Sequence, residues 1–577
     1  MKKQINRNYI WSKLIVDFMQ SAGVKDVCIS PGSRNTPLVL AFAANKKIRR
    51  HVIVDERASG FFALGLSKTS ASPVAIVTTS GTAVAELYPA IIEAYFQKIP
   101  LIICTADRPH YLRNSGANQT INQDNIYKNH IRYFADFGLP EINYKKLQKA
   151  KNNLASAFTL IDSEFVGPIH FNFPFEKPFE PSNTTDSVKS ELLDKIRNDF
   201  VFNPSSSRKR ATTDNNIFEI ISSAQNVLIL SGDSTDEKEK SYLIKIAKHL
   251  QSPIIAGILS PVRFVDSNYV IKNASTFLRN KSITKQIQPD LILQFGYAPT
   301  SNSILEFFSK SKAVKIAINN FNQKFDPSLT TKFVVKKSAE NFYFSLLKST
   351  EERKDGDYLQ ELKKIDTQTG ILKDNYLSRL KDFFEWNAYT KLLEQIPLDS
   401  NIMISNSLPV RDFDFVANIS KNIKVFSNRG ASGIDGIIST AAGIFNATRK
   451  ATYLVIGDLA FYYDLTSLFL LKKYKIPLKI ILVNNNGGGI FELLPIADEK
   501  IDFQNYFKTP LDIDFEPIIK SFGGKYFYVE NEKSFIKTLR TINKLSEFVV
   551  LEIKVNSTIS KNLRQKFWNE INTSFAL

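Results

Sequence analysis

Residues 451–489 read ATYLVIGDLAFYYDLTSLFLLKKYKIPLKIILVNNNGGG and contain two apolar runs, at 451–458 and 479–486. Both runs are rich in Val, Ile and Leu, as buried strands are, and each ends in polar or glycine residues. The segment between them has room for one helix, so the stretch predicts a strand–helix–strand crossover. Two strands joined in this way lie parallel and end at the same edge of a sheet.

The same alternation of apolar runs and helix-like segments occurs on both sides of this stretch. Amphipathic segments at 58–68 and 83–98 separate some of the runs, and strands separated by helices predict a parallel sheet covered by helices. The fold class that follows is α/β, with three doubly wound parallel-sheet domains. The other predicted strands are 26–30, 51–56, 73–79, 100–107, 226–233, 252–259, 291–297, 313–319, 401–407 and 548–555.

Two stretches of different composition divide these groups of strands. Residues 182–216 are rich in Ser, Thr, Asn and Asp and predict a linker, while residues 336–376 are rich in Lys and Glu and predict an exposed, helical boundary. A chain of 577 residues, at about 150 residues per domain, has room for several domains. The predicted domains are residues 1–182, 215–350 and 375–577.

Composition narrows the class of protein. Hydrophobic residues are 43% of the chain and charged residues 23%, which excludes wholesale disorder and fibrous repeats. The formal net charge of +18 introduces the alternative of a basic protein that binds nucleic acid. The basic residues are scattered, however, and their densest cluster, 208–210, lies in the predicted linker. We therefore expect a solvated basic surface and no nucleic-acid partner.

Cysteine count and hydropathy exclude several further classes. Cys28 and Cys104 are too few for a disulfide framework or a structural zinc site, and both lie in apolar runs. The first 20 residues are not typical of a signal peptide, because Lys13, Asp17 and Gln20 interrupt the apolar region. No run reaches the about 18 apolar residues that a membrane helix needs. We expect a cytoplasmic protein without membrane contact.

The polar residues that follow the two quoted runs predict a metal site. Asp458 and Asn485 are 27 positions apart, about the length of one crossover, so their side chains should emerge at the same edge of neighbouring strands. Together with a backbone carbonyl exposed at Gly487, they form an all-oxygen set that suits Mg²⁺ and a bound phosphate. Such residues are also common in ordinary turns. That alternative does not explain why both pairs stand at strand ends with this spacing.

Longer motifs resemble one family of thiamine-diphosphate-dependent enzymes, the 2-succinyl-5-enolpyruvyl-6-hydroxy-3-cyclohexene-1-carboxylate synthases. The GD…NN pair is similar to the Mg²⁺–diphosphate motif of the wider superfamily. The resemblance covers the first and third predicted domains, whereas the middle domain matches only in its general pattern. The motifs that carry it are ISPGSRNTPL (29–38), DERASGFFALGLSK (55–68), TSGTAVAELYPAIIEA (79–94), TADRP (105–109), GANQTINQ (116–123), NSLPVRD (406–412), NRGASGIDG (428–436), GDLAFYYDL (457–465) and NNNGGGIFELLP (484–495).

The resemblance implies thiamine diphosphate as cofactor and Mg²⁺ or Mn²⁺ as its ion, with Asp458, Asn485 and Gly487 as metal ligands. It implies that the first domain binds the pyrimidine ring and the third the diphosphate. Glu56 would be the catalytic residue, hydrogen-bonded to the aminopyrimidine ring so that the cofactor loses its C2 proton. In this superfamily the glutamate comes from the partner subunit, which implies a homodimer, with a homotetramer as the alternative. The cofactor-binding residues implied are Glu56, Ser80, Asn406, Ser432, Ile434, Gly457, Asp458, Leu459, Asn485, Gly487, Gly488 and Ile490.

The family's substrates, 2-oxoglutarate and isochorismate, each carry two carboxylates, which arginine forks bind well. The implied transferase reaction of menaquinone biosynthesis decarboxylates 2-oxoglutarate and adds the resulting carbanion in 1,4-fashion to isochorismate. A simple 2-oxoacid decarboxylase or an acetolactate-synthase-like carboligase is the alternative; those enzymes lack this arginine set, and the middle domain has no G-x-G-x-x-G flavin fingerprint. The substrate-binding residues implied are Ser33, Arg34, Arg108, Gln119, Ser407, Arg411 and Arg429, with Phe491 and Leu494 in an apolar wall.

Two positions depart from the family pattern. Where many members carry a histidine after GDLAF, this chain has Tyr462 and Tyr463. A lysine often found in the middle domain corresponds to Asn302, so one carboxylate contact is either lost or taken over by Lys310 or Lys312. The residues alone leave these two alternatives open.

Overall fold

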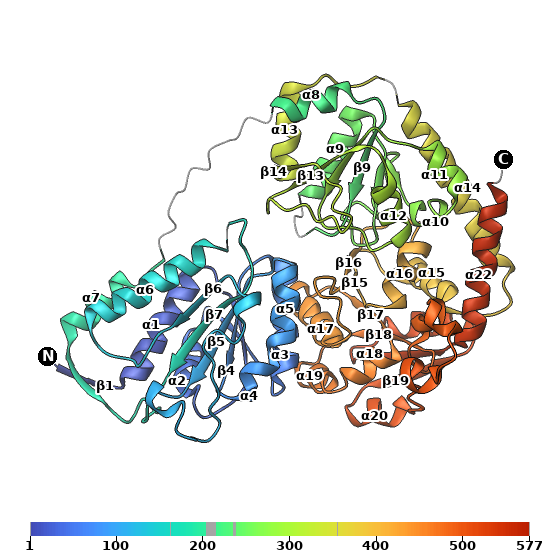
Figure 1. Ribbon diagram of the computed structural model, residues 1–577. Helices are drawn as coiled ribbons and strands as arrows, with labels where there is room; N and C mark the ends of the chain where they lie inside the picture. The colour runs from blue at the N-terminus through green and yellow to red at the C-terminus, as the bar shows by residue number, and fades with distance from the viewer. Residues whose placement is uncertain (1, 162, 203–214, 235–237, 355, 576–577) are drawn as a thin grey trace. The chain divides into compact units, whose positions relative to one another are not determined.

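The computed structural model describes residues 2–161, 163–202, 215–234, 238–354 and 356–575. Contacts group the described residues into two compact units. Unit 1 takes those of Met1–Lys209, Asn428–Arg449 and Asp464–Tyr474, and unit 2 takes those of Arg210–Ser427, Lys450–Tyr463 and Lys475–Leu577. One six-stranded parallel sheet lies in unit 1 and two lie in unit 2 (Figure 1).

The sheet of unit 1 has the strand order β3-β2-β4-β5-β7-β6, and every neighbouring pair is parallel. Its four middle strands are buried along their whole length, as expected when helices cover both faces. Its strands are β2 (Asp26–Ile29), β3 (Arg49–Val52), β4 (Val74–Thr78), β5 (Leu101–Asp107), β6 (Tyr133–Asp136) and β7 (Ile169–Pro174). A separate antiparallel pair joins β1 (Lys2–Ile5) to β8 (Asp186–Lys189).

The helices of unit 1 include two short segments from late in the chain. Helix α17 packs closely on α3, because Gly65 and Gly443 have no side chain at the crossing; a Cβ on Gly65 would lie 2.2 Å from the carbonyl oxygen of Thr440. The helices are α1 (Arg7–Ser21), α2 (Thr36–Ala44), α3 (Glu56–Ser70), α4 (Thr82–Glu86), α5 (Tyr88–Phe96), α6 (Tyr144–Thr159), α7 (Ser190–Asp199), α17 (Ile437–Thr448) and α19 (Ser467–Tyr474), with short 3-10 turns at His110–Leu112 and Lys128–His130.

The first sheet of unit 2, here called the central sheet, has the order β11-β10-β9-β12-β13-β14 and is parallel throughout. Buried side chains cover both of its faces. Its strands are β9 (Val227–Ser231), β10 (Ile254–Ala256), β11 (Val270–Ile271), β12 (Leu291–Phe295), β13 (Val314–Asn319) and β14 (Phe333–Lys336). The helices of this part of the chain are α8 (Asn215–Ser223), which precedes β9, and α9 (Glu239–Leu250), α10 (Ala274–Phe277), α11 (Lys281–Gln286), α12 (Asn302–Lys310), α13 (Ala339–Ser349) and α14 (Asp357–Arg379).

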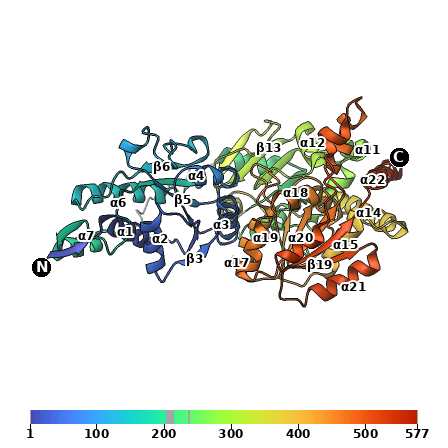
Figure 2. The ribbon, with the colours of Figure 1, turned by 90° about the horizontal axis from the view of Figure 1, so that it is seen from below.

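The second sheet of unit 2, here called the C-terminal sheet, has the parallel order β16-β15-β17-β18-β20-β19. Helix α22 runs beside α14 (Figure 1 and Figure 2). The strands are β15 (Asn401–Ile404), β16 (Lys424–Phe426), β17 (Thr452–Gly457), β18 (Lys479–Asn484), β19 (Lys525–Val529) and β20 (Val549–Lys554). The helices are α15 (Glu385–Gln395), α16 (Leu408–Val416), α18 (Asp458–Tyr463), α20 (Phe515–Ser521), α21 (Glu532–Ile542) and α22 (Ser557–Ser574), with shorter turns at Gly489–Leu493, Pro495–Asp498 and Gln504–Lys508.

The predicted α/β class with three parallel sheets is confirmed, and each predicted strand range overlaps a strand. The overlap is smallest for the range 51–56: β3 begins earlier, at Arg49, and ends at Val52, because Asp55 already caps helix α3 by accepting from the N–H of Ala58 at 3.0 Å. The strands outside the predicted ranges are β1, β6, β7, β8, β11, β14, β16 and β19. In β7, the buried His170 and Asn172 interrupt the apolar pattern that marks strands in the sequence.

The two stretches predicted as boundaries carry more structure than expected. Beyond residue 182, β8 pairs with β1, and Phe200 packs on Phe18 in the core of unit 1. The stretch 336–376 is helical as predicted, but it is not simply exposed, because Leu346 and Leu362 are buried in the hydrophobic cores. The boundaries 1–182, 215–350 and 375–577 stay a proposal.

Candidate active site

The two motifs that predict a metal site meet at one edge of the C-terminal sheet. Strands β17 and β18 are parallel neighbours, with Gly457 opposite Val483. Asp458 is the first residue of α18, directly after β17, and its Oδ2 accepts a hydrogen bond from the N–H of Gly487 at 2.6 Å. The expected proximity of the two strand ends is therefore present, and the Asp458 carboxylate lies against the glycine segment that follows β18.

Two oxygens at this edge have the properties of cation ligands. Asp458 is 2% exposed, and burial raises the pKa of its carboxyl group to about 6. The buried Oδ1 of Asn485 accepts no hydrogen bond. Leaving such an oxygen uncompensated is costly, and a divalent ion held by carboxylate and amide oxygens would satisfy both groups. The residues present therefore fit the predicted ion.

The neighbouring asparagines are engaged in other contacts. Asn484 donates from its Nδ2 to Glu552 at 2.6 Å, and Asn486 donates to Asp512 at 2.7 Å. Asn485 thus stands between two residues whose side chains hold the loop. Within the described ranges, no three His, Cys, Asp or Glu side chains cluster in a way that could hold a metal ion. The candidate set at this edge has a single carboxylate, Asp458.

Contacts within the chain explain why glycines follow β18. Gly487 has a φ of 124°, and a Cβ there would lie 2.1 Å from the carbonyl oxygen of Lys508. A Cβ on Gly488 would lie 2.7 Å from the carbonyl oxygen of Phe507. These two glycines are required by the close approach of the 507–509 segment, whereas the sequence suggested approach to a phosphate. Gly457 differs, because a Cβ there would meet nothing within 4 Å.

The predicted apolar wall lies directly after these glycines. Ile490 and Phe491 are half-buried in the turn Gly489–Leu493, and Leu494 is 45% exposed. Glu492 anchors this turn through an ion pair of 2.6 Å with Lys508 and a hydrogen bond of 2.7 Å from Ser557. The wall therefore presents apolar side chains from an anchored turn. Leu459, predicted to bind cofactor, is in α18 next to Asp458.

Asn406 and Ser407 lie between β15 and α16, and Arg411 follows within α16. Asn406 is buried, and Ser407 has a φ of 71°, which costs energy for a residue with a side chain. Arg411 is exposed and donates from its Nη1 to the carbonyl oxygen of Ser407 at 2.7 Å. A strained turn followed by an exposed guanidinium is a suitable arrangement for binding an anion. Tyr462 and Tyr463, at the end of α18, are 49% and 51% exposed.

Asn302 and the two lysines that could replace the family's lysine, Lys310 and Lys312, lie at opposite ends of helix α12. Asn302 begins α12 and is exposed, whereas Lys310 ends the same helix and pairs with Glu306 at 2.5 Å. Eight residues of helix correspond to about 12 Å. Lys310, and Lys312 just beyond it, therefore occupy the opposite end of α12 from Asn302, which disfavours a simple replacement of one by the other.

In unit 1, Glu56 begins helix α3. Asp55 caps the helix, so Glu56 occupies its first turn. The side chain is half-buried, and the pKa of its carboxyl group is raised, mainly by burial and further by the nearby carboxylates of Asp55 and Glu86. A half-buried carboxyl group with a raised pKa is suited to hydrogen bonding with a ring nitrogen.

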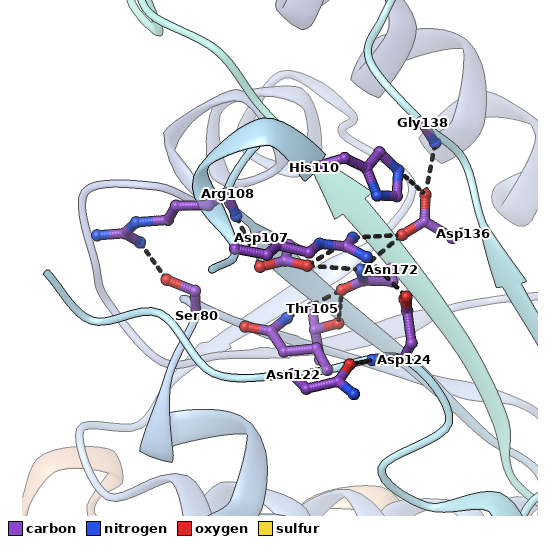
Figure 3. Close-up of polar contacts among 12 residues, drawn as sticks. Ser80, Thr105, Asp107, Arg108, His110, Asn122, Asp124, Asp136, Gly138 and Asn172 are labelled. Carbon is purple, nitrogen blue, oxygen red and sulfur yellow. Dashed lines mark hydrogen bonds and ion pairs between the residues drawn. The ribbon is translucent and has the colours of Figure 1, made fainter. Parts of the chain in front are cut away.

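A second group of predicted residues forms a connected cluster in unit 1. Arg108 follows β5 and donates from its Nη1 to the hydroxyl of Ser80 (Figure 3). Ser80 and Gln119 exchange two hydrogen bonds, from the serine hydroxyl to the carbonyl of Gln119 at 3.1 Å and from the glutamine amide to the carbonyl of Ser80 at 2.9 Å. Burial lowers the pKa of Arg34, and the nearby positive charge of Arg108 lowers it further. Ser33, beside Arg34, is exposed.

A buried polar network beneath this cluster was not predicted. Asp107 accepts from the N–H of Arg108 at 2.7 Å and from Asn172 at 2.9 Å (Figure 3). Gln123 donates to Asn172 at 2.9 Å and accepts from the N–H of Gly81 at 3.1 Å. The network therefore fixes both the segment that carries Arg108 and the segment that carries Ser80. Asp107 and Gln123 are part of the quoted motifs 105–109 and 116–123, which is the signal that could have identified them.

The loop 429–434 carries three predicted residues: Arg429, Ser432 and Ile434. Glu93 of α5, 2% exposed, accepts from the N–H groups of Gly430 and Ala431, each at 2.7 Å. Ser432 has a φ of 62°, and Ile434 is 36% exposed. Glu93 thus determines the conformation of the loop, and sequence reasoning did not find it. The predicted residues fall into two groups, one in each unit; unit 1 holds Ser33, Arg34, Glu56, Ser80, Arg108, Gln119, Arg429, Ser432 and Ile434.

Comparisons with known proteins agree with this architecture. Residues 11–126 match the thiamine pyrophosphate enzyme N-terminal TPP binding domain, and residues 417–553 match the thiamine pyrophosphate enzyme C-terminal TPP binding domain. The crystal structure of benzoylformate decarboxylase from Polynucleobacter necessarius superposes with a TM-score of 0.70 at 14% identity, covering 95% of this chain and 98% of that one. The fold and the two matched domains define a thiamine pyrophosphate enzyme.

Curated relatives narrow the class to one family. A 2-succinyl-5-enolpyruvyl-6-hydroxy-3-cyclohexene-1-carboxylate synthase from Bacillus pumilus is 34% identical over 93% of this chain and 92% of its own length. The synthase of the same name from Geobacillus kaustophilus is 32% identical over 97% of both chains. The chain belongs to the 2-succinyl-5-enolpyruvyl-6-hydroxy-3-cyclohexene-1-carboxylate synthase family. Among the described residues, no helix is both long and apolar enough to span a membrane.

Proposed function

We propose that this chain is a thiamine-diphosphate-dependent transferase of menaquinone biosynthesis, which joins 2-oxoglutarate and isochorismate into 2-succinyl-5-enolpyruvyl-6-hydroxy-3-cyclohexene-1-carboxylate with loss of carbon dioxide. The observation that carries the proposal is near-full-length similarity to synthases of this name, together with the two thiamine pyrophosphate domain matches. A decarboxylase or acetolactate-synthase-like enzyme is not favoured, because curated relatives over almost the whole chain carry the synthase name.

When bound, thiamine diphosphate supplies the nucleophilic carbon and the electron sink for decarboxylation and carbon–carbon bond formation. Asp458, Asn485 and the backbone at Gly487 would hold a divalent ion, Mg²⁺ or Mn²⁺, against its diphosphate. The buried carboxylate of Asp458 and the hydrogen-bond-free oxygen of Asn485 support this assignment. Gly488, Leu459 and Asn406 would line the same cofactor site.

Glu56 would hydrogen-bond the pyrimidine ring and hold a proton there. Its place in the first turn of α3 and its raised pKa support this role. Arg34, Arg108, Arg411 and Arg429 would orient the carboxylates of the two substrates, with Ser33, Gln119 and Ser407 as hydrogen-bonding partners. Phe491 and Leu494, with Ile490, would exclude water from the reacting groups.

The test is an assay of the full chain with thiamine diphosphate and Mg²⁺. We expect carbon dioxide release from 2-oxoglutarate, and formation of the joined product when isochorismate is present. Pyruvate in place of 2-oxoglutarate is the control and should give no product. Turnover of pyruvate in preference to 2-oxoglutarate would overturn the proposal and support the acetolactate-synthase-like alternative.

We also propose a homodimer in which Glu56 serves the cofactor held by the partner, as the family resemblance implies. Two inactive variants, Glu56→Gln and Asp458→Asn, test this when they are mixed and reassociated. Random pairing makes half of the dimers mixed, each with one intact site of two, so about a quarter of the wild-type activity should return. No recovery, although mixed dimers form, would contradict the shared site. The cytoplasmic location and the absence of a nucleic-acid partner stay predictions.

A further inference from the structure

Helix α16 carries two buried aspartates, Asp412 and Asp414, close to Arg411 in the sequence. Asp412 is 5% exposed and Asp414 is 1% exposed. Each is approached by an arginine from another element: Arg564 of α22 reaches Asp412, and Arg263 reaches Asp414. Buried charges of this kind cost much desolvation energy and persist only with good partners. The helix that presents Arg411 is therefore held at two points.

The first attachment lies within the C-terminal part of the chain. Arg564 donates from its Nη2 to Asp412 at 2.6 Å, and the indole N–H of Trp386 donates to the other carboxylate oxygen at 2.9 Å. Glu385 lies 3.6 Å from the same guanidinium and also accepts from Ser560 at 2.5 Å. Helices α15 and α22 thus fix the middle of α16.

The second attachment comes from the central sheet. Arg263 is completely buried, and its guanidinium donates to three carbonyl oxygens: Asp414 at 2.7 Å, Ala417 at 3.1 Å and Ala256 at 2.6 Å. Ala256 is the last residue of β10, whereas the other two carbonyls lie at the C-terminal end of α16. A single side chain therefore ties the end of a central strand to the end of the helix that presents Arg411.

Further contacts make this attachment rigid. The carboxylate of Asp414 accepts from the N–H of Ile258 at 2.8 Å, and Ser275 donates to the carbonyl of Asp414 at 3.1 Å. Lys373 of α14, 1% exposed, donates to the carbonyl of Phe415 at 3.0 Å. The last carbonyls of a helix need donors, and cationic donors are favourable there. All of these donors come from the central part of unit 2.

The consequence concerns the other end of the helix. Helix α16 has only nine residues, and the residue that precedes it, Ser407, is strained and accepts a hydrogen bond from Arg411. A short helix held rigidly at its C-terminal end transmits any rotation directly to its first turn. A substrate-binding guanidinium displaced by about 1 Å loses the geometry of its bidentate contact with a carboxylate, so substrate binding weakens.

We infer that Arg263 is a positioning residue, through which the central sheet orients α16 and so places Arg411 for a substrate carboxylate. The inference rests on the proposed function, since that function assigns Arg411 to substrate binding. The central sheet would then contribute to substrate binding by orienting α16, without binding a ligand of its own. Arg263 itself is completely buried and acts through α16, not by contact with substrate.

The test compares Arg263→Lys with Arg411→Lys in the full-length enzyme with thiamine diphosphate and Mg²⁺. A lysine retains the charge but has one nitrogen in place of the three separate nitrogens with which Arg263 reaches the three carbonyls. Arg411→Lys first identifies the substrate whose KM depends on Arg411. We expect Arg263→Lys to raise the KM for that same substrate about tenfold, with kcat and the calorimetric Kd for thiamine diphosphate changed less than about twofold.

Arg353→Lys is the matched control. Arg353 also donates to helix-end carbonyls, those of Ile221 and Ala224 at 2.7 Å each and Gln225 at 3.1 Å, in a different part of the central domain. It should lower the melting temperature without changing either KM. An equal rise in KM in Arg353→Lys, an effect on the other substrate only, or an active Arg263→Lys enzyme with unchanged KM would overturn the inference.

A milder variant tests the same inference if Arg263→Lys does not fold. Asp414→Asn retains the shape of the side chain and its acceptor for the N–H of Ile258, while it removes the charge facing Arg263. It should raise the same KM by a smaller factor, and an unchanged KM in folded Asp414→Asn enzyme counts against the inference. If the wild-type enzyme itself does not act on 2-oxoglutarate and isochorismate, the proposed function fails. If the wild type is active and only the KM shift is missing, the positioning role alone fails.

Discussion

The carboxylate of Asp458 accepts a hydrogen bond of 2.6 Å from the N–H of Gly487, 29 positions later in the chain. The contact exists because β17 and β18 are parallel neighbours that end at the same edge. One carboxylate oxygen is thereby fixed by the backbone, close to the segment that contains Asn485. This geometry leads to the first prediction, on the metal.

Asp458→Asn should weaken thiamine diphosphate binding in the presence of Mg²⁺ by roughly a hundredfold, because the charged ligand of the ion is lost. Calorimetric titration with and without a chelator measures this. In the wild type, the chelator should produce a similar loss, and in the variant it should have little further effect. Glu499→Gln changes an exposed carboxylate that follows the turn Pro495–Asp498; it is the control and should bind as the wild type does. Retained Mg²⁺-dependent binding in Asp458→Asn would remove this residue from the metal site.

Glu56→Gln should reduce turnover by about a hundredfold or more, because an amide cannot serve as the proton-holding group. Thiamine diphosphate affinity should change less than about threefold, since the diphosphate and its ion contribute most of the binding. Steady-state kinetics and calorimetry on the same preparation separate the two effects. The neighbouring exposed carboxylate Glu86, changed to glutamine, is the matched control and should leave turnover within about twofold. Turnover at the wild-type rate in Glu56→Gln would contradict its catalytic assignment.

Arg108→Lys should raise the KM for one dicarboxylate substrate about tenfold, because a lysine loses the fork geometry that also contacts Ser80. The measurement is KM for 2-oxoglutarate and isochorismate separately. Arg50→Lys, an exposed arginine that donates to the carbonyl of Ala43 at 2.8 Å, should leave both constants unchanged. If Arg108→Lys instead lowers only the melting temperature, its role is structural.

The buried His170 predicts a pH dependence of stability. Burial lowers the pKa of His170 to about 3, and its Nε2 pairs with Thr105 at 2.8 Å. In the unfolded chain a histidine has a pKa of about 6.5, so below that pH the unfolded state takes up a proton that the folded state does not. Stability is therefore lost as the pH falls, by about 2 kcal/mol between pH 6.5 and 5.

His170→Phe should reduce the fall in apparent Tm between pH 7 and 5, whatever its stability at pH 7. Phenylalanine suits the site because the rings of Tyr127 and Phe134 pack on the histidine. Thr105→Val is the control: it removes the hydrogen bond but leaves the histidine, so its Tm should be lower at every pH with the slope retained. An unchanged slope in His170→Phe would show that other groups produce the acid sensitivity.

Much of the fold could be predicted from the sequence because parallel strands buried on both faces leave continuous apolar runs, such as 101–104 and 480–483. Strand β7 escaped prediction because its His170 and Asn172 are polar. Their burial is stabilised by Thr105, Gln123 and Asp107, partners that become neighbours only in the folded chain. The helical stretch after β14 was expected to be exposed, because its charged composition hides the apolar positions that face the core.

The sequence by itself determined the chemistry at the strand ends, since residue type and spacing already place Asp458 and Asn485 directly after neighbouring parallel strands. Only the tertiary structure decided what holds the proposed site residues in place. Glu93 binds the 430–431 backbone, Arg263 binds the end of α16, and the glycines after β18 admit the 507–509 segment. These partners are hundreds or tens of residues apart, and backbone carbonyl and N–H groups are the same in almost every residue. The sequence therefore does not show which backbone groups a buried side chain will bind; only the folded chain does.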